Sequence, residues 1–421
     1  MRSRLSAVLS SFSPARSPAP PSSSTSRRRV LWLSCVAHAL HDGYTDMIYV
    51  LLPVWQADFG LGYGALAMLR GIYAGTMASL QLPAGRVAQR FGARATLVGG
   101  TLLASLGYAC AGLSGSLLGL CVTLAISGSG SSTQHPLASG AVSRAYGRDA
   151  RGPLSVYNFA GDLGKSALPA AIALLITLMP WRHALWLMSV LGVAVALGLA
   201  IWLPNLARTV VAADAKASET SDSPAQAAHG KRALRYGFWL LFSIGVFDTA
   251  VRMGVLTFLP FLMKAKGASG PQVGTALALV FIGGAAGKFA CGWIGERMGV
   301  CGTVLATESA TAACIVALLF APLGPTWVLL PLLGTMLNGT SSVLYGTVPE
   351  LSPADGTERA FALFYTGAIA AGAIAPVLYG VLGDRIGVTG ATVATALTAV
   401  AILPMALFLR GYLAPDKTSQ A

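Results

Sequence analysis

The chain has 421 residues, of which 54% are hydrophobic and only 11% are charged, and its mean hydropathy is +0.65. A soluble domain carries roughly 25% charged residues, so this composition excludes an ordinary soluble protein and predicts a polytopic membrane protein. The net charge of +13 would suggest nucleic-acid binding in a soluble protein, but arginine-rich cytoplasmic loops explain it better here. The six cysteines show neither paired nor metal-type spacing, so no disulfide or cysteine metal site is expected.

Residues 1–29 contain ten serines and six arginines, which predicts a disordered basic tail. Twelve apolar segments follow, each close to the roughly 20 residues that a helix needs to cross a bilayer. We expect spans near residues 30–56, 65–89, 95–114, 117–143, 153–178, 183–204, 236–263, 271–295, 303–321, 326–349, 359–383 and 389–410. The predicted fold is an all-α membrane protein with an N-terminal six-helix bundle (30–204), a cytoplasmic linker (205–235), a C-terminal six-helix bundle (236–410) and a cytoplasmic tail (411–421).

Lysine and arginine are distributed unevenly between the two sets of loops. With the amino terminus inside, 21 of the 29 basic residues fall on the cytoplasmic side and four fall on the other side. Because positively charged loops stay in the cytoplasm, this ratio predicts that both termini are cytoplasmic, in a bacterial type of inner membrane. The remaining four basic residues lie within predicted spans: Arg70, Lys165, Arg252 and Lys288.

An internal repeat emerges when the first half is shifted by 207 residues. Residues that bend a helix, make a turn or carry charge then coincide: Pro53 with Pro260, Gly85 with Gly292, Arg90 with Arg297, Gly92 with Gly299, and Pro169 with Pro376. Two related halves predict that the substrate site lies between them, near the middle of the membrane.

The first span contains an unusually polar stretch, HALHDGYTDMIYVLLP, from His38 to Pro53. Its acids Asp42 and Asp46 are one helical turn apart, roughly 18 to 24 Å into the span, where facing lipid would be too costly. Desolvation and mutual repulsion favour a proton on one of them, so both are predicted proton carriers; a structural polar contact is the alternative. For His38 and His41, proton relay and simple hydrogen bonding fit equally well, and no metal site is expected.

The segment Gly85-Arg-Val-Ala-Gln-Arg90-Phe-Gly92-Ala-Arg94 resembles the loop between the second and third spans of the major facilitator superfamily. A second copy, with Gly292, Glu296, Arg297 and Gly299, is similar to the matching loop after the eighth span. The glycines permit close helix approach and a tight turn. The resemblance covers residues 30–410 and implies alternating access, with the loop charges latching the halves in the outward-open form. Gln89 replaces the family's acidic residue in the first copy.

Within that superfamily the chain resembles the fosmidomycin-resistance branch of drug exporters. The resemblance rests on residues 38–53, on GSGSSTQHP at 128–136 and on residues 151–169, with a weaker similarity at 349–351. It implies export of a drug-like molecule and hence antibiotic resistance. Gln134 stands where this branch usually has an aromatic residue, and the substrate remains open.

The fourth span carries His135-Pro136, roughly 12 Å from its cytoplasmic end. Proline removes a helical donor, so a bend there would turn Gln134 and His135 toward a cavity; a simple kink with a hydrogen-bonded histidine is the alternative. Tyr49 and Asn158 are predicted to complete this substrate pocket, together with His38.

Two acid–base pairs occur within single predicted spans. Asp162 and Lys165 are three residues apart, and Asp248 and Arg252 are four apart, so each pair can close on its own helix. In the functional alternative, an anionic ligand pairs with Lys165 or Arg252 while Asp162 or Asp248 takes up a proton.

Three further charges receive no predicted site role. Lys288 lies about two turns from the cytoplasmic end of the eighth span and is expected to snorkel. Arg70 is placed near the opposite interface, where it would snorkel or gate. Glu308 is placed near the cytoplasmic end of the ninth span, with a structural role.

Together these patterns predict a proton-coupled secondary transporter that exports a small anionic or zwitterionic molecule, works as a monomer and uses no cofactor. An uptake symporter for an organic acid or other nutrient is the main alternative. A membrane-embedded lipid-modifying enzyme fits poorly with the repeat, and a scaffold or sensor leaves the intramembrane cations unexplained. No phosphate-binding loop of the Walker type occurs in the sequence, which disfavours an ATP-driven pump.

Overall fold

The computed structural model describes residues 24–204, 224–352 and 357–413. The predicted tail up to residue 23, the linker residues 205–223 and the final residues 414–421 lie outside the described residues. All regular structure in the described ranges is helical, and the twelve predicted spans are present. On length and composition alone, seven described helices could cross a membrane, and the last of these has 53 residues, enough for two spans.

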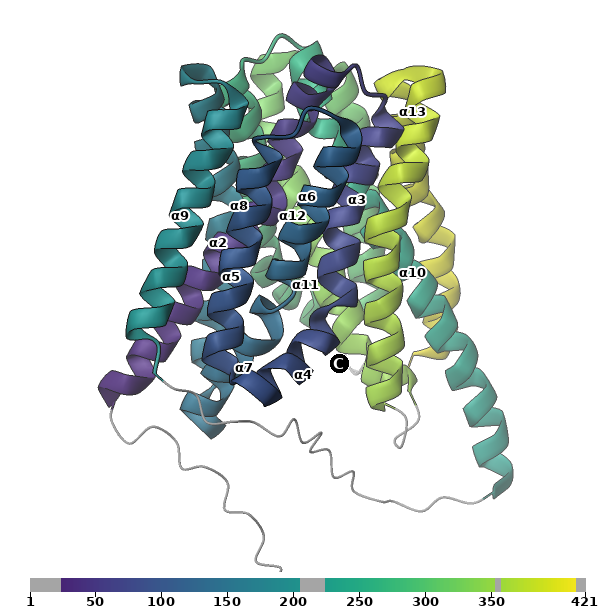
Figure 1. The fold of residues 1–421 in the computed structure, drawn as a ribbon. Helices are drawn as coiled ribbons and strands as arrows, with labels where there is room; N and C mark the ends of the chain where they lie inside the picture. Colours follow the sequence, from purple (N-terminus) through teal and green to yellow (C-terminus); the bar gives the residue numbers. More distant parts are fainter. Residues whose placement is uncertain (1–23, 205–223, 353–356, 414–421) are drawn as a thin grey trace, which may run out of the picture.

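Six spans form each half of the molecule, and several of them are broken or joined (Figure 1). The first half contains α2 (Ser24–Phe59), α3 (Tyr63–Ser79) with α4 (Gln81–Phe91), α5 (Ala93–Ala111), α6 (Leu117–Ser131) with α7 (Gln134–Tyr146), η1 (Gly147–Asp149), α8 (Arg151–Leu178) and α9 (Trp181–Trp202). The second contains α10 (Pro224–Ala265), α11 (Gly270–Phe320), α12 (Leu323–Thr347), η2 (Val348–Leu351), α13 (Thr357–Leu409) and η3 (Arg410–Tyr412). Both α11 and α13 hold two spans, with sharp turns at Gly299 and Gly387.

Two helices extend beyond the predicted spans into polar sequence. Helix α2 begins at Ser24, inside the predicted tail, and α10 begins at Pro224, inside the predicted linker. The added residues of α10 are rich in alanine, lysine and arginine, which favour helix, and proline is well accepted in a first turn. The helical pattern therefore continues past the apolar segment that the hydropathy marks.

The 207-residue repeat is visible in the backbone. Gly92 and Gly299 both have left-handed φ angles, of 90° and 66°, at equivalent turns. A further pair at the same offset, Gly60 and Gly267, has φ angles of 62° and 84°. Side chains with a Cβ rarely adopt these angles, so glycine is required at the same places in both halves.

Small residues allow the helices of each half to approach closely. A Cβ added to Gly334 of α12 would lie 2.0 Å from the backbone oxygen of Val280 in α11. A Cβ added to Gly283 would lie 2.1 Å from the oxygen of Pro331. These glycines therefore serve helix packing, as expected where lipid supplies little hydrophobic drive between helices.

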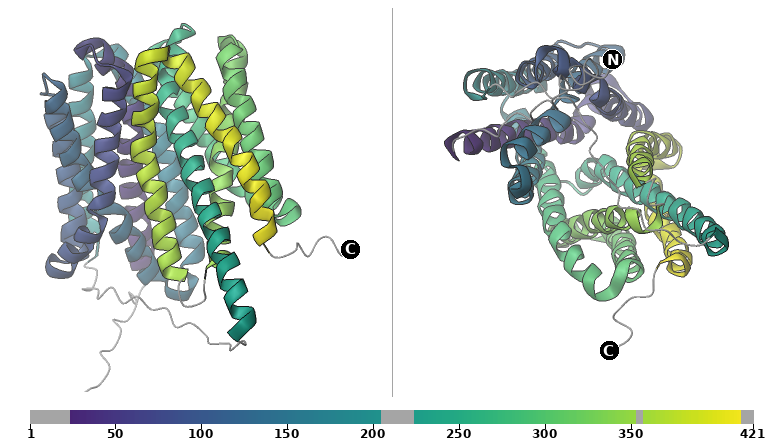
Figure 2. Two further views of the ribbon diagram at one scale, coloured as in Figure 1. Left: turned by 90° about the vertical axis from the view of Figure 1, so that its right-hand side faces the viewer. Right: turned by 90° about the horizontal axis from the view of Figure 1, so that it is seen from below.

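The two halves lie side by side when seen along the bundle (Figure 2). They are joined at the end opposite Ser24, the upper end in Figure 1. There Asp384 of α13 accepts hydrogen bonds from the backbone amides of Tyr63 and Gly64, at 2.6 and 3.0 Å. A carboxylate at a helix N-terminus is a favourable pairing, so this contact fastens α13 to α3. At the same end, Gly274 of α11 packs against α8.

Candidate functional site

A cavity of about 300 Å³ lies between the halves. Its lining comes from both of them: Asp42, Thr45, Asp46, Arg70, Met77, His135, Asp162, Lys165, Arg252, Met253, Leu256, Phe281, Gly284, Asn338 and Tyr365. Three acids balance three permanent cations in this set. The predicted placement of the substrate site between two related halves therefore coincides with a charged cavity in the structure.

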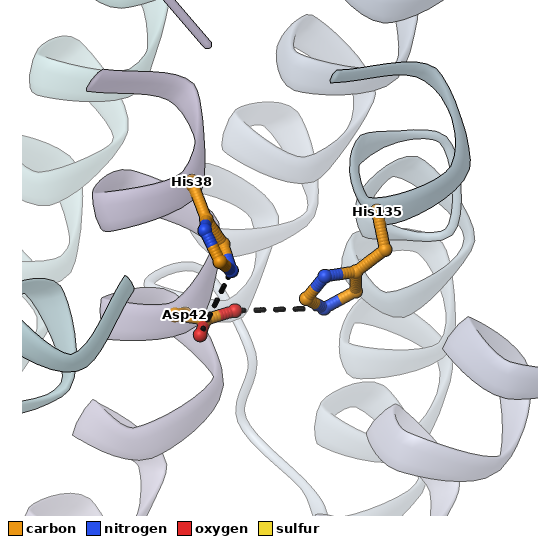
Figure 3. A group of neighbouring side chains, drawn as sticks. All are labelled: His38, Asp42 and His135. Carbon is orange, nitrogen blue, oxygen red and sulfur yellow. Dashed lines mark ion pairs between the residues drawn. The ribbon is translucent and has the colours of Figure 1, made fainter. Parts of the chain in front are cut away.

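Asp42, in the middle of α2, is the centre of the polar contacts. Its Oδ2 lies 3.2 Å from His38 Nε2 and 3.2 Å from Lys165 Nζ, and its Oδ1 lies 3.5 Å from His135 Nε2. Figure 3 shows both histidines directed at this carboxyl group. Asp42 itself is only 6% exposed. We refer to Asp42, His38, His135 and Lys165 as the Asp42 centre.

The hydrogen bond of His38 with Tyr157 determines which of its ring nitrogens faces Asp42 without a hydrogen of its own when the imidazole is neutral. His38 Nδ1 lies 2.8 Å from the carbonyl oxygen of Tyr157, which can only accept, so Nδ1 carries a hydrogen. The facing atoms are then His38 Nε2 and Asp42 Oδ2, which lie 3.2 Å apart, a spacing at which a proton can be shared between the imidazole and the carboxyl group.

Three residues of the Asp42 centre, His38, Asp42 and His135, also have the spacing of a metal site. Ligand atoms of His38, Asp42 and His135 lie within 4.8 Å of one another. However, the Lys165 ammonium lies on Asp42 Oδ2, beside the place that a cation would take. A metal ion bound to Asp42 would lie close to the Lys165 ammonium, and two positive charges repel strongly in a buried site. The donor set therefore fits a proton better than a metal ion.

Asp162 of α8 links the Asp42 centre to the second half. Its Oδ1 lies 3.9 Å from Lys165 Nζ, which is the predicted pair on one helix, while its Oδ2 lies 2.7 Å from Lys288 Nζ on α11. The expectation that Lys288 snorkels is wrong, because its ammonium reaches across to Asp162 from the other half. Asp42, Lys165, Asp162 and Lys288 thus form a continuous row of alternating charges.

Asp46 forms a second cluster one turn further along α2. Arg70 Nη2 lies 3.8 Å from Asp46 Oδ1, and the guanidinium lies 5.1 Å from the centre of the Tyr49 ring. Arg70 is 6% exposed and lines the cavity. Its predicted place near an interface is therefore wrong: it lies seven residues into α3, which is deep enough to reach the cavity. Tyr49 donates to Met253 Sδ of the second half, at 3.4 Å.

The spacing of Asp248 and Arg252 on α10 predicted that the two side chains could pair directly, but in the structure they are bridged by a serine. Arg252 Nη1 donates to Ser341 Oγ at 3.0 Å, and Ser341 Oγ donates to Asp248 Oδ2 at 2.8 Å. The serine comes from α12 and bridges the two charges. Arg252 lines the cavity, whereas Asp248 lies behind it and is 3% exposed.

His41 has a complete set of neutral partners. Its Nδ1 lies 3.0 Å from Ser131 Oγ and its Nε2 lies 3.0 Å from Thr101 Oγ. Since Thr101 donates its own hydrogen to Leu97, it accepts from His41 Nε2, and Ser131 can donate to Nδ1. A neutral imidazole satisfies every contact, which favours hydrogen bonding over proton relay for this residue.

The fourth span is broken where the bend was expected, between α6 and α7 at residues 132–133. The break directs His135 into the cavity, but Gln134 is buried and donates instead to the Tyr157 hydroxyl at 2.8 Å. Asn158, predicted to line the pocket, is exposed and lies outside the cavity lining. About half a helical turn separates the inward from the outward face of α8, and the sequence does not mark which residue faces inward.

The loop-motif residues lie at the same end of the molecule as Ser24 (Figure 1). Gly85 and Arg90 are on α4, Gly92 makes the turn, and Arg94 donates to the Ala200 carbonyl within its own half. The second copy places Gly292, Glu296 and Arg297 on α11 before the turn at Gly299. Because the halves are joined at the opposite end, the structure is not in the form that the predicted outward-open latch would stabilise.

These features can be set beside known families. The model of the Major Facilitator Superfamily matches residues 34–249 and 241–421. The chain belongs to this superfamily. It is accordingly a multi-pass membrane protein and a secondary transporter of small molecules rather than an enzyme, which confirms the resemblance inferred from the loop motif. Among curated proteins, none matches the sequence significantly.

Solved structures of the superfamily share the fold. Two crystal structures of a bacterial homolog of the human lysosomal transporter Spinster, inward-facing unoccupied and inward-facing occupied, align with TM-scores of 0.74 and 0.73. Identity is 16% in both, and the alignments cover 95% of this chain and 100% of the other. At that identity the likeness shows the fold alone.

Proposed function

We propose that this superfamily member couples protons to the movement of a small anionic or zwitterionic molecule. The observation that supports this most is the Asp42 centre, a buried carboxyl group shared by two histidines and a lysine in a cavity between the halves. Changing the protonation of Asp42 changes the charge balance that a ligand meets. That dependence is what coupling a proton to a ligand requires.

The row of alternating charges links this proton to the arrangement of the halves. Protonating Asp42 weakens its attraction for Lys165, which then turns toward Asp162, at present 3.9 Å away. Asp162 would then be shared more equally between Lys165 and Lys288, and the contact across the halves would loosen. Three consecutive ion pairs thus connect a protonation event with the opening of one end, as alternating access demands.

The cations of the cavity indicate the charge of the substrate. Lys165, Arg70 and Arg252 all line it, and the two guanidinium groups can bind a carboxylate, phosphate or phosphonate with paired hydrogen bonds. Asp46 lies on the same wall and can pair with a ligand ammonium. A volume of about 300 Å³ restricts the ligand to a small molecule.

The nature of the ligand sets the direction of proton coupling. A zwitterion could bind Asp46 through its ammonium group only when Asp46 has lost its proton, so ligand and proton would be exchanged. A simple anion could bind Lys165 only when Asp42 is protonated and has released it, so ligand and proton would move together as cotransport. We propose exchange, and therefore export, because of the resemblance to the fosmidomycin-resistance branch. Uptake by symport is the second candidate, favoured by the direct Asp42–Lys165 pair.

The orientation supports access from the cytoplasm. We place both termini inside, in an inner membrane, on the ratio of 21 cytoplasmic to four external basic residues. The end closed by Asp384 and Tyr63 then faces outward. The loaded cavity of an exporter would be reached from the opposite, cytoplasmic end.

The proposal is tested first by binding and then by proton flux. Purified protein is screened by thermal shift against amino acids, organic acids, phosphonates and common antibiotics, and each stabilising compound is added to proteoliposomes containing a pH-sensitive dye. We expect ligand movement to change the internal pH, with opposite signs for exchange and cotransport. A compound that is bound and transported without any pH change, and without dependence on a pH gradient, would contradict proton coupling.

Direction is tested in cells with the radiolabelled form of the same compound. For an exporter, an uncoupler raises accumulation because outward pumping stops. For an uptake symporter, the uncoupler lowers accumulation. Cells carrying Asp42→Asn provide the control, since their accumulation should not respond to the uncoupler.

A further inference from the structure

A second pair of acidic side chains lies deep in the second half. Asp248 of α10 and Glu308 of α11 are 3% and 1% exposed, and the residues at the equivalent positions of the first half, His41 and Thr101, are in hydrogen-bond contact. Neither lines the cavity, and Arg252 lies between Asp248 and the cavity. Two carboxyl groups can hydrogen-bond only when one of them carries a proton.

The surrounding hydroxyl groups show where that proton sits. Thr307 donates to the backbone oxygen of Thr303 at 2.8 Å, and Thr340 donates to Thr307 at 2.7 Å. The Thr340 hydrogen is therefore directed away from Glu308. Moreover, Oε2 of Glu308 has no hydrogen-bond partner among the described residues. An ionised Glu308 would leave Oε2 as a buried carboxylate oxygen without a donor, which is costly.

Asp248 is placed differently. It accepts from Ser341, which is itself held by Arg252, so a negative charge on Asp248 has a donor and a nearby cation. The other titratable group facing the pair is the Tyr345 hydroxyl of α12. One cation beside two acids balances one negative charge, and the remaining carboxyl group must be neutral.

The repeat shows that the fold itself does not require acids here. Shifting by 207 residues places Asp248 on His41 and Glu308 on Thr101. In the first half these equivalents form a neutral contact, with His41 Nε2 lying 3.0 Å from Thr101 Oγ. The same place is therefore filled without charge in one half and by two carboxyl groups in the other.

We infer that Asp248 and Glu308 form a second proton-binding site, in which Glu308 carries the proton and donates it to Asp248. The site is connected to the cavity through Ser341 and Arg252. An anion that draws Arg252 toward the cavity would remove the charge that stabilises ionised Asp248 and would tighten the hold of the pair on its proton. This role in transport rests on the proposed function, whereas the protonation of the pair does not.

Infrared spectroscopy of the purified full chain at near-neutral pH tests the protonation directly. We expect a C=O stretching band of a protonated carboxyl group that shifts in heavy water and disappears in Glu308→Gln. Glu350→Gln, at an exposed glutamate of η2, should leave the spectrum unchanged. In Asp248→Asn the band should persist at a changed frequency, because the acceptor of the proton has changed.

Isotopic labelling keeps the test independent of variant folding. Labelling the carboxyl carbons of glutamate in the unaltered protein should shift the same band. If no protonated band shifts with this label, Glu308 is ionised and the inference is wrong. Failure of the proposed function would be seen separately, as a labelled band that persists in a protein showing no ligand-linked proton flux in proteoliposomes.

Discussion

Lys288 Nζ of the second half lies 2.7 Å from Asp162 Oδ2 of the first, and this ion pair joins the two sides of the cavity. Its partners come from α11 and α8, 126 residues apart. Asp162 also attracts Lys165 from its own helix, at 3.9 Å. The pair across the halves therefore competes with a pair that depends on the charge of Asp42.

Replacing Lys288 by methionine should let the two halves move further apart at the end of the molecule that carries Ser24. The side chain is partly exposed, so we expect a loss of about 1 kcal/mol, or roughly a fivefold shift in the conformational equilibrium. Spin labels at Phe91 and Met298, exposed equivalents in the two halves, would report the distance in a cysteine-free background. An unchanged distribution in Lys288→Met would show that the pair does not hold the halves.

Replacing Asp384 by asparagine should loosen the opposite end. The carboxylate caps the first turn of α3 through the amides of Tyr63 and Gly64, and losing its charge should cost about 1 kcal/mol. Labels at the exposed residues Ala57 and Ile386 should then show a longer-distance population. The matched control is Asp58→Asn, at an acid of the same end that pairs with Arg182 within one half. If both variants behave alike, Asp384 has no special role in closure.

Much of the fold follows from local sequence, whereas the partners within the cavity do not. Hydropathy fixes the twelve spans, and the left-handed turns at Gly92 and Gly299 follow from the glycine spacing. The contact of Lys288 with Asp162 depends on how two halves dock, and no pattern near either residue reports it. Similarly, Ser341 of α12 separates Asp248 from Arg252, which spacing on one helix would bring together.

The depth of a charged side chain within its span is also difficult to predict from the sequence. Arg70 could be assigned to an interface only because the start of the second span was placed close to it. The helix begins at Tyr63, so Arg70 lies about two turns deep and joins Asp46. Glu308 shows the same difficulty, because its burial depends on where α11 turns, at Gly299.

Substituting alanine for Gly334 should destabilise the second half. The added methyl group would lie 2.0 Å from the Val280 carbonyl oxygen. Because this neighbour is backbone, the clash can be relieved only if α11 and α12 move apart. We expect a loss of about 1–3 kcal/mol. Gly324→Ala on the same helix has free space around the new methyl group and should be neutral. Thermal unfolding in detergent compares the two, and equal melting temperatures would contradict the packing argument.

Replacing His38 by glutamine should remove the dependence of transport on pH while leaving ligand binding largely intact. Glutamine cannot both donate to the Tyr157 carbonyl and exchange a proton with Asp42, as the imidazole does. Initial transport rates across a range of internal pH values provide the measurement. His183→Gln, at an exposed histidine beside Trp186, is the control and should keep the wild-type profile. A wild-type profile in His38→Gln would remove this residue from proton handling.

The role of Asp42 is tested most directly by counting protons moved per ligand in proteoliposomes containing Asp42→Asn. We predict that this variant still exchanges labelled for unlabelled ligand across the membrane but produces no ligand-driven change in internal pH. Asp149→Asn, at an exposed acid of η1, should move protons as the unaltered protein does. If Asp42→Asn moves protons and ligand in the unaltered ratio, the Asp42 centre does not couple them.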